Sequence, residues 1–291
     1  MSPHLIAVPE VPQRLCKLPA FWPVSARIRE RLDARADLPE ITQLISLDAA
    51  ISAEILVAAN SPVYGVASRI YNVHEALTIL GWDQVKRLLH AVVRGRLETD
   101  VRTDPLIQAS WTHSLAAAFF ASELALFFGI PEDRAYTLGL MHDIGRLGLL
   151  ATCPGPYLDV VAGAYRTPLE CLGSEECVLG MNHCKAGFWL ARVWGLPTEF
   201  SESAAAHHNL VIDSHWNAAK LAGMACRLAH ASGFAVEHCK PVSAEETISI
   251  APPELLQRLQ PRLGEIEARG RSRLLESMDG FCQLDPAVSR H

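Results

Sequence analysis

The stretch Gly139-Leu140-Met141-His142-Asp143-Ile144-Gly145-Arg146 is the most informative part of the sequence, because two adjacent polar residues stand there inside an apolar, helix-forming run. Such a run is expected to be buried, and buried polar groups need partners. Two interpretations follow. Either His142 and Asp143 bond to other polar side chains in a dry polar core, or they share a bound cation with them.

Further histidines occur on both sides of this stretch, again in apolar, helix-forming sequence: His113, His183 and the pair His207-His208. Imidazole and carboxylate groups hold Zn, Mn, Fe or Ni, and a metal site in a helical protein takes its ligands from several helices. A single histidine in apolar sequence is more often a core or surface residue than a ligand. The ordered series nevertheless favours a cation over a polar core. It predicts a divalent transition metal (Fe, Mn, Ni or Zn), as one or two ions.

Composition limits the class of protein. The 291 residues are 49% hydrophobic, which is enough for a substantial core in one large domain or two smaller ones. The net charge of −6 and the dispersed lysines and arginines argue against a nucleic-acid partner. The chain opens without a signal-peptide pattern, and no apolar run of about 18 residues stands out. We therefore expect a cytoplasmic protein without a membrane partner.

The eight cysteines include no Cys-x-x-Cys pair and lie mostly in apolar sequence. A disulfide framework is not expected at this size and spacing. Most of these cysteines are predicted to be buried, reduced thiols that pack like small apolar groups.

Hydrophobic periodicity predicts helices along almost the whole chain, and no alternating strand pattern stands out. Asp48 is expected to cap a helix that ends near Asn60-Ser61-Pro62, and Gly81 is expected to end another. The other front helices are predicted at 24–34, 40–47, 73–80 and 83–92. The later helices are predicted at roughly 106–128, 132–152, 156–166, 174–180, 183–194, 198–207, 215–232 and 252–278.

The polar segment 98–105, which closes with a proline, is the best candidate for a boundary between the front helices and the histidine-bearing part. After residue 240 the chain is charged and interrupted by prolines. The predicted helix at 252–278 is its one amphipathic element.

Several motifs occur in a fixed order along the chain. In the front part they are Leu18-Pro19-Ala20, Asn60-Ser61-Pro62-Val63-Tyr64-Gly65 and Glu75–Gly81. Later they are Trp111-Thr112-His113-Ser114, the stretch from Gly139 to Arg146, Glu176–His183, Trp194-Gly195-Leu196-Pro197 and His207-His208. This linked set, over about residues 15–235, resembles the HDOD domain, a bacterial signalling relative of the HD-superfamily phosphohydrolases.

The resemblance implies an all-α fold in which an N-terminal helical lobe precedes an HD-like helical core. It places a tail at 1–14, the HDOD domain at 15–235 and a C-terminal extension at 236–291. Within the domain, the lobe would span 15–100 and the metal-binding core 101–235.

The same resemblance assigns metal ligands. It implies one site formed by Asp143 with His183, His207 and His208. A second site would be formed in large part by His113, His142 and the same Asp143.

The sequence departs from the pattern of enzymatic relatives at one ligand. Those relatives carry a late aspartate in an Ala-Asp-x-Leu-Ala context, whereas the matching stretch here is Ala225-Cys226-Arg227-Leu228-Ala229. A Cys226 thiolate remains a candidate ligand for a soft or borderline metal. Loss of a hard oxygen ligand argues against a two-metal phosphodiesterase, which needs two cations to hold a phosphoryl group. Arg146, in place of a usual lysine, and the lack of Gly-Tyr-Pro after His208 argue against hydrolysis of cyclic di-GMP.

Two functions remain open. The first is a signal-transduction output module that acts through a signalling protein partner or a small phosphorylated ligand. The second is a metal-dependent phosphohydrolase acting on a nucleotide or another phosphate ester. In the second case Asp143 and Arg146 would be catalytic, with Arg146 stabilising phosphate charge. If Arg146 has no such role, it is expected to be a solvated residue at a helix end.

Overall fold

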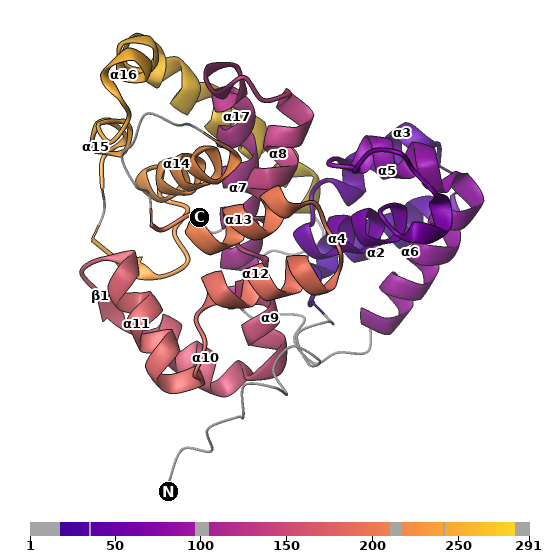
Figure 1. Ribbon diagram of the computed structural model, residues 1–291. Helices are drawn as coiled ribbons and strands as arrows, with labels where there is room; N and C mark the ends of the chain where they lie inside the picture. The colour runs from indigo at the N-terminus through magenta and orange to yellow at the C-terminus, as the bar shows by residue number, and fades with distance from the viewer. Residues whose placement is uncertain (1–17, 35, 97–104, 210–216, 241, 283–291) are drawn as a thin grey trace, which may run out of the picture.

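The computed structural model describes residues 18–34, 36–96, 105–209, 217–240 and 242–282 and shows a protein built almost entirely from helices (Figure 1). In this described part, strands occur as the two-residue β1 (Ala164–Tyr165) and β2 (His238–Cys239), which pair in parallel. The prediction of an all-α fold is confirmed. A front lobe lies on the right of Figure 1, beside a larger lobe that carries the histidines.

The front lobe consists of short helices whose starts are set by side-chain caps. Asp48 accepts a hydrogen bond from the Ile51 amide at the start of α4, and Asn72 accepts one from the Glu75 amide at the start of α5. Gly81 ends α5 with a φ of 72°, a backbone region that favours glycine. The elements of the lobe are α2 (Trp22–Asp33), α3 (Leu38–Ile45), α4 (Ala49–Ala59), η1 (Pro62–Tyr64), α5 (Val73–Leu80) and α6 (Trp82–Arg96).

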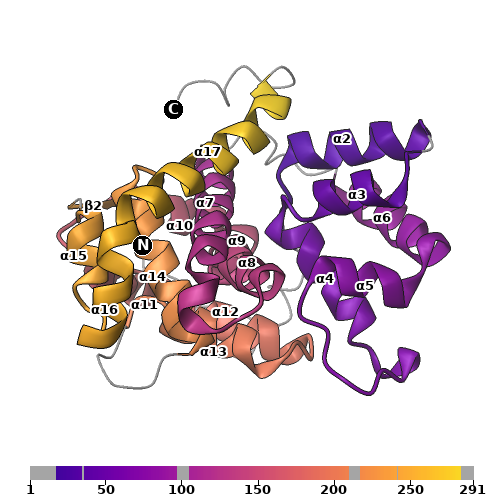
Figure 2. The same cartoon turned by 90° about the horizontal axis from the view of Figure 1, so that it is seen from above.

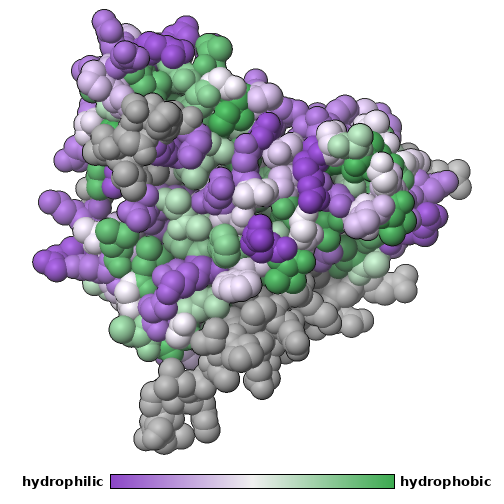
Figure 3. All heavy atoms as spheres, in the orientation of Figure 1, coloured by the Kyte–Doolittle hydropathy of each residue, from purple (hydrophilic) through white to green (hydrophobic). Residues whose placement is uncertain are grey.

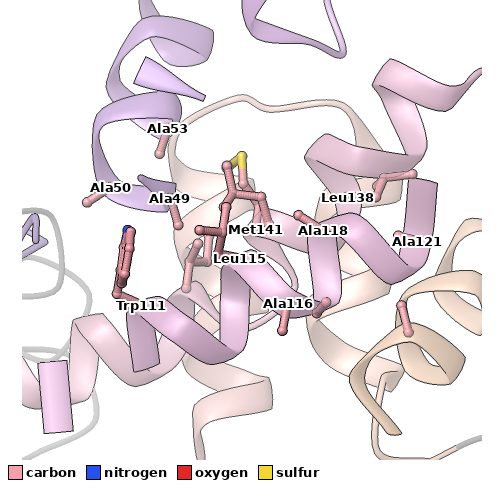
Figure 4. Close-up of a cluster of buried hydrophobic side chains, with 14 of the residues drawn as sticks. Ala49, Ala50, Ala53, Trp111, Leu115, Ala116, Ala118, Ala121, Leu138 and Met141 are labelled. Carbon is pink, nitrogen blue, oxygen red and sulfur yellow. The ribbon is translucent and has the colours of Figure 1, made fainter. Parts of the chain in front are cut away.

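Helix α7 (Pro105–Phe128) is the centre of the larger lobe, and α8, α14 and α17 pack around it (Figure 2). Small residues allow a close approach: a Cβ on Gly139 of α8 would lie 2.6 Å from the Ala117 carbonyl oxygen. Figure 4 shows other small side chains of α7, including Ala118 and Ala121, inside this buried cluster. The other helices of the core are α8 (Glu132–Met141), α9 (Ile144–Thr152), α10 (Pro154–Val161), α11 (Pro168–Leu179), α12 (His183–Val193), α13 (Thr198–Ala206) and α14 (Ala218–Ala231).

By length and composition, α7 is apolar enough to cross a membrane, which differs from the expectation that no such run occurs. However, 78% of its most apolar stretch is buried inside the protein. A helix that is apolar on all sides is typical of the centre of a folded core, where neighbours cover every face.

The C-terminal extension packs against the core. Figure 2 shows α17 (Leu263–Cys282) running alongside α7, and Phe281 meets Trp111 edge-on at a ring-centroid distance of 5.9 Å. The single helix predicted at 252–278 is instead divided into α16 (Pro253–Leu259), a 3-10 turn η2 (Gln260–Arg262) and α17. Pro261 lacks the N–H that a continuous helix would need. A shorter helix, α15 (Ala244–Ile248), precedes them.

Aromatic and hydrogen-bonding contacts join the two lobes. The Phe21 ring stacks on Trp111 at 4.2 Å, and Trp111 Nε1 donates to the Leu47 carbonyl at 2.6 Å. The Tyr136 hydroxyl donates to the Ser46 carbonyl at 2.9 Å. The segment 98–105, predicted as the boundary, lies outside the described residues except for its proline, which begins α7.

The outer surface is mixed in character. In the view of Figure 3, hydrophilic side chains spread over both lobes, with apolar patches between them. Exposed large apolar side chains occur on several different helices, including Leu126 on α7 and Trp189 and Val193 on α12. The pattern matches ordinary protein surfaces, in which single apolar residues are common.

Two helices of the core differ from the prediction, one by a break and one by an earlier end. The helix predicted at 132–152 is broken between Met141 and Ile144, at the His-Asp pair. The helix predicted at 156–166 ends at Val161, because Ala164 and Tyr165 pair with β2 from the C-terminal extension. Both differences arise from contacts with segments distant in the sequence.

Candidate metal centre

The break between α8 and α9 places the His-Asp pair. His142 is the C-terminal cap of α8, and Asp143 precedes α9 with φ −112° and ψ 19°. Since neither residue lies within a helix, the pair faces the centre of the core from between two helix ends. His142 is 1% exposed and Asp143 is 3% exposed, so both polar groups are removed from water.

The other predicted ligands come from three further helices and converge on the same place. His113 lies in the middle of α7, His183 is the first residue of α12, and His207 caps the end of α13. These three are at most 1% exposed, and His208, the next residue, is partly buried. The structure therefore brings together all six residues that the sequence proposed as ligands.

Each of the four buried histidines has its Nδ1 held by an acceptor. The Nδ1 atoms of His113, His142 and His207 lie 2.7, 2.6 and 2.9 Å from the carbonyl oxygens of Phe234, Gly139 and Ala204. His183 Nδ1 lies 2.8 Å from the carboxylate of Glu175. Since a carbonyl only accepts, Nδ1 must carry the proton in the first three, which leaves Nε2 with a lone pair in the neutral ring. This is the arrangement that outer partners impose on metal-binding histidines.

The Nε2 atoms turn inward, toward Asp143. His183 and His207 present Nε2 at 3.4 and 3.6 Å from Asp143 Oδ1, and His113 presents Nε2 at 3.9 Å from Oδ2. His208 Nε2 lies 3.1 Å from His183 Nε2. This geometry defines an inward-facing set of nitrogen and oxygen donors.

Several of these inward atoms have no hydrogen-bond partner among the described residues. They are Asp143 Oδ1, His142 Nε2 and His207 Nε2. Leaving a buried polar atom unsatisfied costs about 1–3 kcal/mol. A dry polar core is thus a poor explanation of the cluster, whereas one or two divalent cations bound among these donors would satisfy the atoms. The residues fit such an ion in number, chemistry and direction.

The electrostatic environment keeps the donors in a metal-binding state. Burial lowers the pKa of His142 to about 4, and burial with repulsion from His230 lowers the pKa of His113 to about 4. Both rings are neutral at pH 7. Burial opposes ionisation of Asp143, but the Arg146 guanidinium and the surrounding histidines hold its pKa well below the usual range. Asp143 is therefore a carboxylate.

His183 differs from the other histidines. Burial and Arg146 disfavour a charge on its ring, but the Glu175 carboxylate outweighs them and raises the pKa of His183 well above its usual value. Together Asp143, Glu175 and Glu237 place three carboxylates, each at most 3% exposed, around two cationic groups, the Arg146 guanidinium and the His183 ring. A divalent cation in the cluster would offset this excess of negative charge.

Arg146 lies inside the cluster. It is 1% exposed, its Nε donates to Asp143 Oδ2 at 2.5 Å, and Nη2 donates to Glu237 Oε2 at 2.9 Å. Nη1 lies 3.4 Å from the Tyr157 hydroxyl. The interpretation of Arg146 as a solvated helix end is wrong, because the first turn of α9 faces the core.

Cys226 of α14 also lies at the cluster. It is 1% exposed, and its Sγ is 3.6 Å from His113 Nε2. Burial raises the pKa of the Cys226 thiol well above its usual value in the metal-free protein. One turn further along α14, His230 brings its ring to 5.0 Å from the ring of His113.

Sequence reasoning missed Glu175, His230 and Glu237. Glu175 precedes the Glu176–His183 motif by one residue. A carboxylate so close to a histidine that begins a helix could have been recognised as the partner of its ring. Glu237 ends the apolar run Phe234-Ala235-Val236, which is a weak signal of burial. Its contact with Arg146 follows from the pairing of β2 with β1, which nothing local predicts.

The comparisons with known proteins agree with this architecture. The family model of the HDOD domain matches residues 18–210, so this chain belongs to the HDOD family. An uncharacterized protein of Treponema pallidum (strain Nichols) is 26% identical over 207 residues, which are 70% of this chain. The chain spans 38% of that relative's length.

Solved structures show the same fold. The MmoQ response regulator of Methylococcus capsulatus str. Bath is 24% identical, with a TM-score of 0.66 over 84% of this chain and 98% of that one. A virulence factor of Campylobacter jejuni subsp. jejuni is 16% identical, with a TM-score of 0.60 over 94% of this chain and 98% of that one. The predicted HD-like helical core with its N-terminal lobe is confirmed.

Proposed function

We propose that this protein is a bacterial, cytoplasmic output module of signal transduction that retains an HD-type metal centre and acts by binding a protein partner or a small phosphorylated ligand. Membership of the HDOD family supports a signalling role. The structurally similar MmoQ is described as a response regulator, which agrees with it. In this proposal the metal centre joins five helices of the core, α7, α8, α9, α12 and α13.

The first metal position would be held by His183, His207 and His208 with Asp143 Oδ1. The three histidines offer nitrogen atoms within 4.8 Å of one another, and two of them lie within 3.6 Å of the carboxylate oxygen. Imidazole with one carboxylate suits a divalent transition metal such as Zn, Fe, Mn or Ni. When bound, such an ion supplies cross-linking of helices and Lewis acidity.

Burial is the observation that favours binding over catalysis. Five of the six proposed ligands are at most 3% exposed: His113, His142, Asp143, His183 and His207. The Arg146 guanidinium, expected to contact phosphate in an enzyme, is 1% exposed and bonds Asp143 and Glu237 instead. Arg146 is therefore suited to positioning Asp143. A phosphate ester at the surface of the described residues would not reach these five buried donors.

Open cavities occur elsewhere on the molecule. One of about 440 Å³ lies between the lobes and is lined by Asn72, Asp133, Tyr136 and Arg273, among others. A neighbouring cavity of about 590 Å³ shares Tyr136 and Arg273. Neither is lined by a residue of the metal cluster. Binding at the junction of the two lobes would suit a module that reports a signal by changing how they are docked.

A metal-dependent phosphohydrolase is the second candidate. It is favoured by His208, which is only partly buried and lies 3.1 Å from His183 Nε2, so one edge of the cluster approaches the surface. In that case Asp143 would hold the metal ion and Arg146 would fix the orientation of Asp143.

One experiment separates the two functions. The protein is loaded with Zn²⁺ or Mn²⁺, its melting temperature is measured, and hydrolysis of bis(p-nitrophenyl) phosphate is followed in the same sample. The binding module predicts a metal-dependent rise in melting temperature, lost in Asp143→Ala but kept in Asp159→Ala on the exposed side of α10, with no hydrolysis above the metal in buffer. Hydrolysis that disappears in Asp143→Ala alone would establish the phosphohydrolase instead.

A further inference from the structure

A second group of metal donors lies beside the first, on the face shared by α7 and α14. Cys226 and His230 are four residues apart on α14 and therefore point from the same face of that helix. His113 of α7 faces them, and α7 and α14 pack directly against each other. The sulfur and two ring nitrogens of these residues lie within 4.8 Å of one another.

The surroundings of this group orient it toward a shared point. His113 Nδ1 is held by the Phe234 carbonyl at 2.7 Å, so His113 Nε2 is the nitrogen that meets Cys226 Sγ. His230 Nε2 has no hydrogen-bond partner among the described residues. Beside it, Glu237 Oε1 is fully buried, lies 3.8 Å from His230 Nε2 and also lacks a hydrogen bond. Two buried polar atoms without a hydrogen bond thus face each other beside a thiol and an imidazole nitrogen.

The donor set decides which metal fits. Thiolate and imidazole together favour Zn²⁺ and similar borderline ions, whereas Mn²⁺ and Mg²⁺ favour carboxylate and carbonyl oxygen. We propose that His113, Cys226 and His230 form a thiolate-containing, zinc-type second position of the metal centre. This inference rests on the metal centre proposed above. It adds Cys226 and His230 to His113 at the second position, for which the resemblance implied His113, His142 and Asp143, and it specifies the class of metal.

Glu237 has a defined place in this proposal. One of its oxygens accepts from Arg146 Nη2 at 2.9 Å, and the other faces His230. The carboxylate faces the same ring nitrogen, Nε2, that lacks a hydrogen bond, so it places negative charge beside the proposed cation position. Glu237 lies outside residues 18–210 that match the HDOD family model, so the C-terminal extension would help to build the second position.

The alternative is a thiol that donates a weak hydrogen bond to His113 and binds no metal. Cobalt distinguishes the two, because thiolate ligation of Co²⁺ gives a charge-transfer band in the near ultraviolet that imidazole and carboxylate ligands do not give. Metal-free protein is titrated with Co²⁺ and its absorption spectrum recorded. We expect this band in the wild type, its loss in Cys226→Ser, and its retention in Cys184→Ser, which removes another buried cysteine close to the cluster at His207.

A second variant and a competition keep the result independent of a folding defect. Cys226→Asp should lose the charge-transfer band but keep the visible bands of bound Co²⁺. In the wild type, two equivalents of Zn²⁺, enough for both positions, should displace the band, whereas excess Mn²⁺ should leave it.

Binding of Co²⁺ by the wild type without a charge-transfer band would overturn the thiolate position while leaving the first metal position intact. A band that persists in Cys226→Ser and disappears in Cys184→Ser would also overturn it. Absence of any Co²⁺ binding would refute the metal centre as a whole, and the second position with it.

Discussion

The close approach of α9 to α12 gives a sharp test of how the fold builds the centre. Gly145 lies in the first turn of α9, two residues after Asp143. A Cβ placed on Gly145 would lie 1.9 Å from the His183 carbonyl oxygen and 2.6 Å from the Gly187 amide nitrogen. Both are backbone atoms of α12, so no side-chain rotation relieves the clash. Since ordinary contact begins at 3.4 Å, the carbonyl must retreat by about 1.5 Å.

We expect Gly145→Ala to lower the free energy of unfolding by at least about 3 kcal/mol, the upper end of the usual cost of overpacking a core. Gly173→Ala is the matched control, because Gly173 lies inside α11 with nothing within 4 Å of the new Cβ. There the better helix propensity of alanine should raise the free energy of unfolding by about 0.5–1 kcal/mol.

Urea unfolding followed by circular dichroism measures both variants. Their stabilities are compared on the condition that the slope of the free energy of unfolding against urea concentration is unchanged. The two substitutions should move the midpoint in opposite directions. If Gly145→Ala unfolds at the same urea concentration as the wild type, α9 and α12 do not pack as described. The distances between Asp143 and His183 would then also be wrong.

Two further predictions concern Arg146 and its partners. Arg146→Met leaves the buried carboxylates of Asp143 and Glu237 without their cation and should lower the free energy of unfolding, measured in urea, by about 3–5 kcal/mol. Arg166→Met at an exposed position should change it by no more than about 0.5 kcal/mol. Equal effects of the two substitutions would refute the role of Arg146. Although burial opposes its ionisation, Arg146 lowers the pKa of Glu237 from 4.5 to about 2. Below pH 4.5 the unfolded chain therefore binds more protons than the folded protein. The stabilisation from the Glu237–Arg146 pair is fully present above pH 4.5 and is lost as the pH falls toward 2. Glu237→Gln should reduce the acid-side slope of stability against pH, and an unchanged slope would contradict the assignment.

The sequence predicted much of the fold through local chemistry. The predicted cap at Asp48 starts α4 because its side chain accepts from the backbone amide three residues later, and such a signal needs only neighbouring residues. The break at His142-Asp143 has no such signal. Glycine and apolar residues continue the helical pattern through it, and the contacts of Asp143 with Arg146 and the distant histidines are formed only in the folded core.

The six proposed ligands were found together because each stands in its own recognisable motif. The residues that support these ligands were not found from the sequence, because a carboxylate such as Glu237 becomes a partner of Arg146 only when the chain returns 91 residues later. The role of the six residues as metal ligands stays a prediction that rests on their convergence and on the unpaired inward atoms.

The zinc content of the protein shows whether the inward-facing histidines hold an ion. The wild type, Asp143→Ala and Asp159→Ala are each equilibrated with excess Zn²⁺, desalted and measured by elemental analysis. We expect one or two Zn²⁺ per chain in the wild type and in Asp159→Ala, with a clear loss in Asp143→Ala. Wild-type protein that retains no more zinc than Asp143→Ala would contradict it, and the inward-facing histidines would then form a polar core without an ion.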